Sequence, residues 1–256
     1  MAEAWSTIAA RYHLGKRSKL SAITCFLKHH PRYARALDIG TGTAALALAY
    51  KPRAFNWRYL EIDEEAAKKA AQTLGQLVET NWAAIESDHF DLITIIDTFF
   101  YFSNPQESIN KINNLLNPKG QLLVTLTNGD NYLWINRLRN YLNLGQSVRG
   151  FAFEESKEVF LNRFDPLFWR LIYLKPFSYP LEEIILLIID WLDQKLSDQK
   201  RDKNKVDKLT KVEGAKGWET RLMQLTWPLL KLVSLLDYPF RPFLQGYRFV
   251  AVFAKK

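Results

Sequence analysis

The sequence predicts an α/β fold in which helices cover a parallel sheet. Short apolar segments alternate with amphipathic segments between residues 35 and 128. The first apolar segment ends in a glycine-dense turn, Gly40-Thr41-Gly42. A hydrophobic content of 48% over 256 residues is enough for a substantial core, which excludes disorder of the chain as a whole.

Five strands are expected in the first half of the chain, each a short apolar segment bounded by turn or helix signals. The segment 90–97 is almost continuously apolar, which is typical of a strand that is covered on both faces. The segment 76–80 fits the strand pattern least well. The expected strands are residues 35–39, 56–62, 76–80, 90–97 and 121–127.

Helices are expected between these strands. Asp63 can cap the N-terminus of one of them, and Gly75 can end it. The sequence Asn-Pro-Lys-Gly at 117–120 predicts a turn before the fifth strand. The expected helices are residues 44–50, 63–75 and 105–116.

The remainder of the chain has a different pattern. Residues 1–30 are expected to be helical, and the charged stretch 197–211 is expected to form an exposed, mobile loop. Two further strands are expected near 168–179 and 246–256. Additional helices are expected over residues 131–144, 154–164, 181–196 and 218–236.

Charge and cysteine content narrow the classes of function. The net charge of +8 would suit nucleic acid or an anionic membrane, but a lysine-rich solvated surface gives the same value. Without an arginine-rich block, nucleic acid is the less favoured partner. The single cysteine, Cys25, excludes an internal disulfide framework, and His29, His30 and His89 lack metal-ligand spacing, so no metal is expected.

The sequence leads to the expectation of a cytoplasmic protein. The first twenty residues lack the apolar core and cleavage site of a signal peptide. The most apolar run, Ile184–Ile189, is far shorter than the roughly 20 residues of a membrane-spanning helix.

The glycine turn alone is compatible with several ligands. Gly40, Gly42 and Ala45 satisfy the dinucleotide pattern G-x-G-x-x-A, and Glu61 follows at the distance of a ribose-binding acid. Asp38 favours a different ligand, because a carboxylate beside the turn would repel a pyrophosphate and attract a cation. S-adenosylmethionine, which carries an ammonium and a sulfonium, would suit such a site.

Several segments together resemble the class I S-adenosylmethionine-dependent methyltransferases. They are Leu-Asp-Ile-Gly-Thr-Gly-Thr-Ala at 37–44, the segment 59–70 with its acid, the strand 90–97, and the helix, turn and strand at 109–125. These segments follow the family's order over roughly residues 30–130. The resemblance implies a Rossmann-like, doubly wound sheet of seven strands with an α-helical insertion in the C-terminal half.

The resemblance also implies roles for single residues. Asp38 would hold the methionine ammonium, directly or through water, and the turn Gly40-Thr41-Gly42 would let the backbone approach the cofactor. Glu61 would accept hydrogen bonds from both ribose hydroxyls, and Ile62 would pack on the adenine. Asp97 and Thr98 would border the methionine moiety and the reacting centre.

The chain departs from the family pattern at three points. Ala44 stands in place of the third glycine of the first motif, and Lys119 replaces a glycine in the turn Pro118-Lys119-Gly120. The acid that often contacts the adenine amino group after the third strand is missing. Asn81 or Glu79 are the candidates for that contact.

Candidates for contacting the methyl acceptor are Tyr101, Tyr12 and His13. Tyr101 stands where many small-molecule members of the family carry a histidine, and aromatic packing is an equally good interpretation of it. Tyr12 and His13 lie in the N-terminal segment, which often covers the cofactor in this family, and a structural role is the more favoured interpretation of both. A general base is optional for methyl transfer, since the chemistry belongs to the cofactor.

The expected organisation has four parts. Residues 1–30 would cover the cofactor site, 31–180 would form the core, 181–240 would be a helical insertion, and 241–256 would add the last core strand. The insertion could be a lid over an apolar pocket, a peripheral membrane surface or a homodimer interface.

The preferred function is methylation of a small, mostly hydrophobic metabolite of secondary metabolism, at O, N or C. The alternatives are an RNA or protein methyltransferase that uses the basic surface, and a non-catalytic partner protein of the same fold.

Overall fold

The computed structural model describes most of the chain, in two compact units. The described residues are 14–29, 33–42, 44, 56–86, 88–99, 102–142, 156–196 and 246–256, with 228, 232, 235, 236 and 239 as isolated positions. The first unit comprises residues 1–21, 127–157 and 176–249, and the second comprises 22–126, 158–175 and 250–256.

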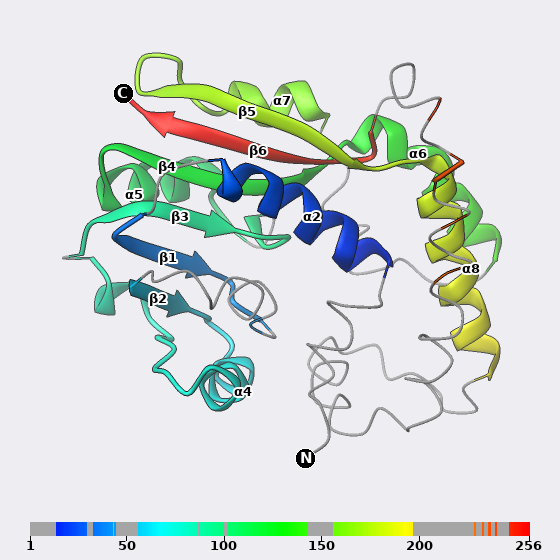
Figure 1. Cartoon of the computed structure of the whole chain (residues 1–256), viewed down its shortest axis with the longest axis horizontal. Helices are drawn as coiled ribbons and strands as arrows, with labels where there is room; N and C mark the ends of the chain where they lie inside the picture. Colours follow the sequence, from blue (N-terminus) through cyan, green and yellow to red (C-terminus); the bar gives the residue numbers. More distant parts are fainter. Residues whose placement is uncertain are drawn as a thin grey trace. The chain divides into compact units, whose positions relative to one another are not determined.

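Six strands form one sheet within the described part of the chain (Figure 1). Their order is β2-β1-β3-β4-β6-β5, and β1 pairs in parallel with β2 and β3, as β3 does with β4. The expected α/β fold with a parallel sheet is therefore confirmed. The strands are β1 (Arg35–Ile39), β2 (Asn56–Leu60), β3 (Phe90–Ile95), β4 (Leu116–Thr127), β5 (Trp169–Ser178) and β6 (Arg248–Lys255).

The strand β6 runs against the direction of the parallel strands (Figure 1). The Lys255 ammonium near its end donates to the carbonyl of Leu116, where β4 begins, at 2.8 Å. At the opposite end, the N–H of Asn128 after β4 donates to the carbonyl of Tyr247 at 2.9 Å. The last strand is thus held between β4 and β5 in the reverse direction.

The expected strand at 76–80 does not join the sheet. Glu79 makes a single parallel bridge to Leu60, and the rest of the segment forms no ladder. Val78 is buried, whereas Leu77 is 73% exposed, so the segment has only one apolar anchor. The described sheet therefore has six strands rather than the expected seven.

The expected turn at 117–120 lies inside a strand. The strand β4 begins at Leu116 and continues through this segment, with a register shift opposite Phe90 and Leu92. Lys119 has a φ of +65°. The backbone thus keeps the left-handed conformation of the missing glycine, at a cost for a residue with a side chain.

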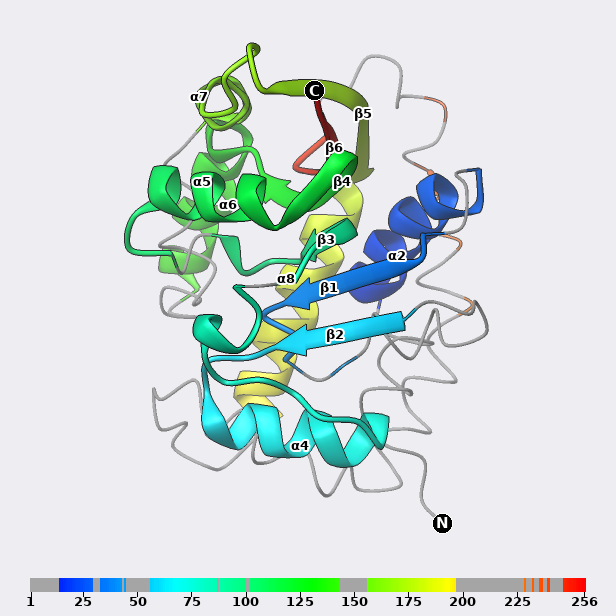
Figure 2. The same cartoon turned by 90° about the vertical axis from the view of Figure 1, so that its left-hand side faces the viewer.

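Two helices of the second unit, α4 and α5, begin and end within about one residue of the bounds that the sequence predicts. In α4 (Glu64–Leu74) the Asp63 carboxylate accepts from the N–H of Ala66 at 2.8 Å, and Gly75 ends the helix with a φ of +63°. Asn104 caps α5 (Pro105–Leu115) through the N–H of Glu107. The buried side chains of α4 pack against Tyr59 of β2, and both views place α4 beside that strand (Figures 1 and 2).

Helices lie on both faces of the sheet, as the doubly wound arrangement requires. The two views place α2 (Leu14–Lys28) and α5 on opposite sides (Figures 1 and 2). Ile23 and Phe26 of α2 are buried, and the Phe26 ring lies 5.0 Å from the ring of Tyr173 in β5. This helix confirms part of the helical segment expected over residues 1–30.

The first unit contains α6 (Gly129–Tyr141) and α8 (Pro180–Leu196). These two helices contact each other, and the apolar side chains Ile185–Leu187 of α8 are buried. A buried ion pair joins Glu183 in the first turn of α8 to Arg248 of β6 at 3.0 Å. The position of α8 matches the helix expected over 181–196, and α6 matches the one expected over 131–144.

A short helix, α7 (Lys157–Asn162), lies within the segment 154–164 that was expected to be helical. The expected helix 44–50, the expected loop 197–211 and nearly all of the expected helix 218–236 lie outside the described residues. Among the helices that are described, none is long and apolar enough to cross a membrane.

Candidate cofactor site

The carboxyl ends of β1, β2 and β3 meet at one edge of the sheet. Ile39 is paired with Leu60 on one side and with Ile95 on the other, so the residues that follow these strands are neighbours. The N–H of Gly40 donates to the carbonyl of Leu60 at 2.7 Å. Ligands of open α/β sheets bind at this edge, where the strand order reverses.

The first glycine of the turn is required by both conformation and space. Gly40 has a φ of +73°, which disfavours any residue with a side chain. A Cβ atom on Gly40 would also lie 2.5 Å from Cγ2 of Thr98, which is closer than any real contact. The Thr98 hydroxyl donates to the carbonyl of Ile39 at 3.1 Å, so the threonine is held in this place.

The second glycine connects the turn to the predicted ribose-binding acid. The N–H of Gly42 donates to Oε2 of Glu61 at 2.9 Å, and the N–H of Asp63 donates to Oε1 at 3.2 Å. Among the described residues, the one atom that a Cβ on Gly42 would meet within 4 Å is the carbonyl oxygen of Gly40, at 3.9 Å. Both oxygens of the Glu61 carboxylate are therefore oriented by backbone donors.

Asp38 is a buried acid at the end of β1, with a relative exposure of 3%. Its Oδ1 accepts a hydrogen bond of 2.7 Å from the hydroxyl of Thr94 on β3, and the Thr41 hydroxyl donates to the Asp38 carbonyl at 3.1 Å. Burial raises the pKa of Asp38 to about 7, the Glu61 carboxylate adds to the rise, and the bond from Thr94 opposes it. The site therefore contains an acid that a nearby cation would ionise.

Ile62 and Asn81 lie beyond the second strand. The Ile62 side chain is 60% exposed, although it is large and apolar. The segment that carries Asn81 is held beside β2, because the N–H of Glu61 donates to the carbonyl of Glu79 at 2.8 Å. Asn81 itself is exposed, and its side-chain oxygen accepts from the N–H of Ala83 and caps a 3-10 turn, η1 (Trp82–Ala84).

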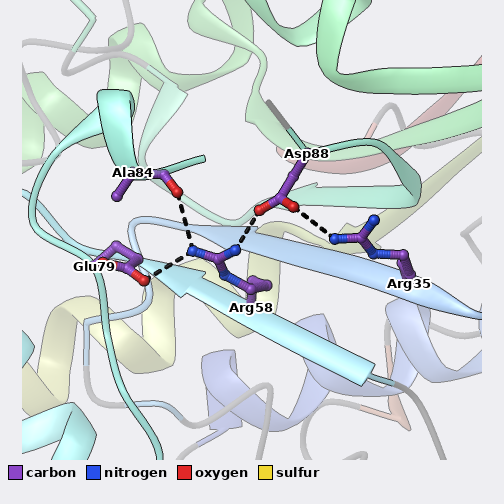
Figure 3. A network of polar contacts seen from close by, with 5 residues as sticks. All are labelled: Arg35, Arg58, Glu79, Ala84 and Asp88. Atoms are coloured by element: carbon purple, nitrogen blue, oxygen red, sulfur yellow. Dashed lines mark hydrogen bonds and ion pairs between the residues drawn. The ribbon is translucent and has the colours of Figure 1, made fainter. Parts of the chain in front are cut away.

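An ion-pair network fixes this segment (Figure 3). Arg58 of β2 contacts the Glu79 carboxylate at 2.8 Å, the Ala84 carbonyl at 3.1 Å, and the Asp88 carboxylate. Arg35 of β1 contacts the other oxygen of Asp88 at 2.7 Å. Two neighbouring strands thus hold both ends of the segment that contains Asn81.

Asp97, at the end of β3, has an unusual backbone. Its φ is +57°, and its side chain is exposed. The Thr125 hydroxyl of β4 accepts from the Asp97 N–H at 2.8 Å and donates to Oδ1 at 2.8 Å.

The sequence pattern missed three residues that orient the predicted ones: Thr94, Thr125 and Arg58. The two threonines did carry a signal, because each interrupts a run of apolar residues close to the carboxyl end of its strand. Arg58 carried a similar signal, as a charged residue in the middle of a strand.

The structure brings together most of the predicted cofactor residues. Contacts link Asp38, Gly40, Thr41, Gly42, Glu61 and Thr98 into one continuous edge, and Asp97 and Ile62 adjoin members of that group. The segment that carries Asn81 is linked to β2 by the bridge between Glu79 and Leu60, and the described contacts of the Asn81 side chain are to its own turn rather than to the glycine turn. The acceptor candidates Tyr12, His13 and Tyr101 lie outside the described residues.

This arrangement can bind a cationic nucleoside derivative. It offers a buried acid, a backbone-oriented carboxylate with lone pairs for a diol, an exposed aliphatic side chain for a base, and a glycine turn where backbone can lie close to a ligand.

The sequence matches a family model described as "Methyltransferase domain" over residues 11–163, which is more than half of the chain. No curated protein sequence is significantly similar to it.

Solved structures share the fold at low sequence identity. A protein of Bacillus halodurans C-125, proposed to be a methyltransferase, has a TM-score of 0.55 and 16% identity, with 93% of this chain and 99% of that chain covered. The N-methyltransferase NodS of Bradyrhizobium japonicum WM9, in complex with S-adenosyl-L-homocysteine, has a TM-score of 0.51 and 12% identity, with 64% and 80% covered. The plantazolicin methyltransferase BpumL, also with S-adenosyl-L-homocysteine, has a TM-score of 0.52 and 12% identity, with 98% and 87% covered.

The family match and the fold confirm the resemblance that the sequence motifs carried. The chain belongs to the methyltransferase-domain family and is an S-adenosylmethionine-dependent methyltransferase.

Proposed function

We propose that the chain methylates a small, mostly hydrophobic metabolite at an oxygen, nitrogen or carbon atom. The observation that carries this proposal is the chemical character of the cofactor edge. The described residues 38–42, 61–63 and 97–99 include four acids and no lysine or arginine. A phosphate backbone would be repelled there, despite the positive net charge of the whole chain.

Four aromatic side chains in contact, Trp82, Phe99, Phe102 and Phe160, which we call the aromatic wall, support an apolar methyl acceptor. The Phe99 ring, two residues after Asp97, lies 5.4 Å from the Phe102 ring and 5.1 Å from the Phe160 ring. Trp82, next to Asn81, lies 6.1 Å from Phe102. Trp82 and Phe102 are half-buried, so the wall presents apolar surface between the segments that follow β2 and β3.

The residues of the edge fit S-adenosylmethionine in the following way. Asp38 would face the methionine ammonium, Glu61 the ribose hydroxyls, and Ile62 the adenine. Asn81 stays our candidate for a contact to the adenine amino group. Asp97 and Thr98 would lie beside the methionine portion.

S-adenosylmethionine supplies an electrophilic methyl group on a sulfonium. The chain therefore needs to align the acceptor with the methyl group and enclose the two, rather than to activate either of them. The glycine turn brings backbone close to the cofactor, and the aromatic wall would exclude water and orient an apolar acceptor. Tyr101, close in sequence to Phe99, is our candidate for contacting the acceptor, followed by Tyr12 and His13.

The test uses S-adenosylmethionine with a radiolabelled methyl group and an extract of the source cells, separated into small-molecule, RNA and protein fractions. We expect label in the organic-extractable small-molecule fraction. The variant Glu61→Ala should lose this transfer. The control variant Lys111→Met, which removes an exposed cation of α5 outside the cofactor edge, should retain it. Label confined to RNA or protein would overturn the proposal and favour a macromolecular acceptor.

A further inference from the structure

Asp97 has a backbone conformation that the family motifs do not explain. Three non-glycine residues have a positive φ within the described part of the chain: Ala44, Asp97 and Lys119. Ala44 and Lys119 stand where the methyltransferase motifs carry glycine, so their conformation is inherited from those motifs. Asp97 replaces no glycine, and its φ of +57° needs another reason.

Hydrogen bonds with the Thr125 hydroxyl hold Asp97 in this conformation. Thr125 is 4% exposed at the carboxyl end of β4, beside the pair Ile95 and Val124 that joins β3 to β4. Its hydroxyl accepts from the Asp97 N–H and donates to Asp97 Oδ1, both at 2.8 Å. One hydroxyl thus sets the backbone and the carboxylate of the same residue together.

A purely structural role would not require this arrangement. Asp97 is exposed, so burial does not force its carboxylate to find a partner. The next residue, Thr98, packs against Gly40 of the cofactor turn. Strained residues that their surroundings hold firmly are found preferentially at functional sites, where orientation matters more than stability.

We propose that Thr125 is a positioning residue for methyl transfer, which acts by holding the Asp97 carboxylate beside the cationic methionine portion of the cofactor. The inference rests on the proposed function, which places Asp97 there. The hydroxyl removes from Asp97 the freedom to turn away, so the carboxylate meets the sulfonium and ammonium without reorganisation.

The test compares Thr125→Val, which keeps the shape and loses the hydroxyl, with Thr125→Ser, which keeps the hydroxyl. Calorimetry of the full chain measures the affinity for S-adenosylmethionine and for S-adenosylhomocysteine. We expect Thr125→Val to weaken S-adenosylmethionine binding about tenfold, because the Asp97 side chain, no longer held by the hydroxyl, must be ordered when the cofactor binds. Thr125→Ser should bind as the wild type does, and the loss should be smaller for S-adenosylhomocysteine, which lacks the sulfonium charge.

A double-mutant cycle shows whether Thr125 acts through Asp97. In the Asp97→Ala background, Thr125→Val should change the affinity by less than about twofold. An equal loss in both backgrounds, or unchanged binding in Thr125→Val, would overturn the proposal. Failure of both Thr125→Val and Thr125→Ala to fold would assign Thr125 to the core and overturn it as well.

Glu61→Ala separates this inference from the proposed cofactor placement. If Glu61→Ala binds weakly while Thr125→Val binds normally, only the role of Thr125 is wrong. If Glu61→Ala binds as tightly as the wild type, the placement of the cofactor is itself wrong.

Discussion

Asp38 is an acid whose surroundings favour its neutral form. It is buried, it lies near the Glu61 carboxylate, and the hydroxyls of Thr94 and Thr41 only partly oppose the resulting rise in its pKa. A folded-state pKa of about 7, above the ordinary value of 3.8, means that the free protein loses stability as pH rises from about 4 to about 7. A bound ammonium would reverse this preference, because it favours the ionised carboxylate.

The affinity for S-adenosylmethionine should therefore rise with pH up to about 7 and then level off. The slope cannot exceed about tenfold per pH unit for one released proton. Above about 8 the affinity should fall again, because an α-amino group loses its proton there. Titration calorimetry at several pH values, in buffers of different ionisation enthalpy, measures both the affinity and the released proton.

Asp38→Asn is the matched variant for this prediction. It should bind more weakly and show no rising limb, because the amide does not titrate. The same pH profile in the variant and the wild type would assign the proton to another group.

At the scale of the element, the segment 79–88 depends on Arg58. The guanidinium is 31% exposed and contacts two carboxylates and a backbone carbonyl (Figure 3). The described residues of the segment make a single bridge to β2, so these contacts replace the ladder that a full strand would have provided. They also support Glu61, whose N–H bonds to the Glu79 carbonyl.

Arg58→Met should destabilise the protein by about 1–3 kcal/mol, because partly buried carboxylates lose a charged donor. It should also speed hydrogen exchange at the amides of Glu61 and Glu79, and weaken S-adenosylmethionine binding. Urea unfolding and exchange mass spectrometry measure these effects.

Lys111→Met is the control, since it removes an exposed helix pair with Glu107. That pair should contribute no more than about 0.5 kcal/mol. Equal losses of stability in the two variants, with unchanged exchange in the segment, would contradict the role of Arg58.

The elements that could be predicted from the sequence are those whose ends are set by residues close to them in the sequence. Asp63 and Gly75 delimit α4 through hydrogen bonds to Ala66 and Ala71, which are close to them in the sequence. The segment 76–80 failed as a strand because its alternation looked adequate, while Leu77 has no neighbour that would bury it. Whether a weak apolar segment joins a sheet depends on what the rest of the fold brings beside it, and one sequence does not contain that information.

The candidate site divides in the same way. The positions of Asp38, Gly40 and Glu61 at neighbouring strand ends could be predicted, because a motif places them there. Thr125 was not, since its partner Asp97 lies 28 residues away in sequence and meets it only through the pairing of β3 with β4.

At the scale of the whole molecule, the two units share secondary structure. The boundary between them falls inside β4, β5 and β6, and also inside α2 and α7. A strand cannot unfold in one unit and keep its ladder in the other. We therefore expect one cooperative unfolding transition rather than two.

Ligand binding tests this expectation, because the described cofactor-site residues all belong to the second unit. S-adenosylhomocysteine at 100 times its dissociation constant should add about 2.7 kcal/mol to the free energy of unfolding. For a chain of this size that corresponds to a rise in Tm of about 5–10 °C. Scanning calorimetry should show the single peak move as a whole. Two peaks, of which only one moves with ligand, would show that the units unfold separately, and an unmoved peak in Glu61→Ala under the same conditions would link the shift to the cofactor site.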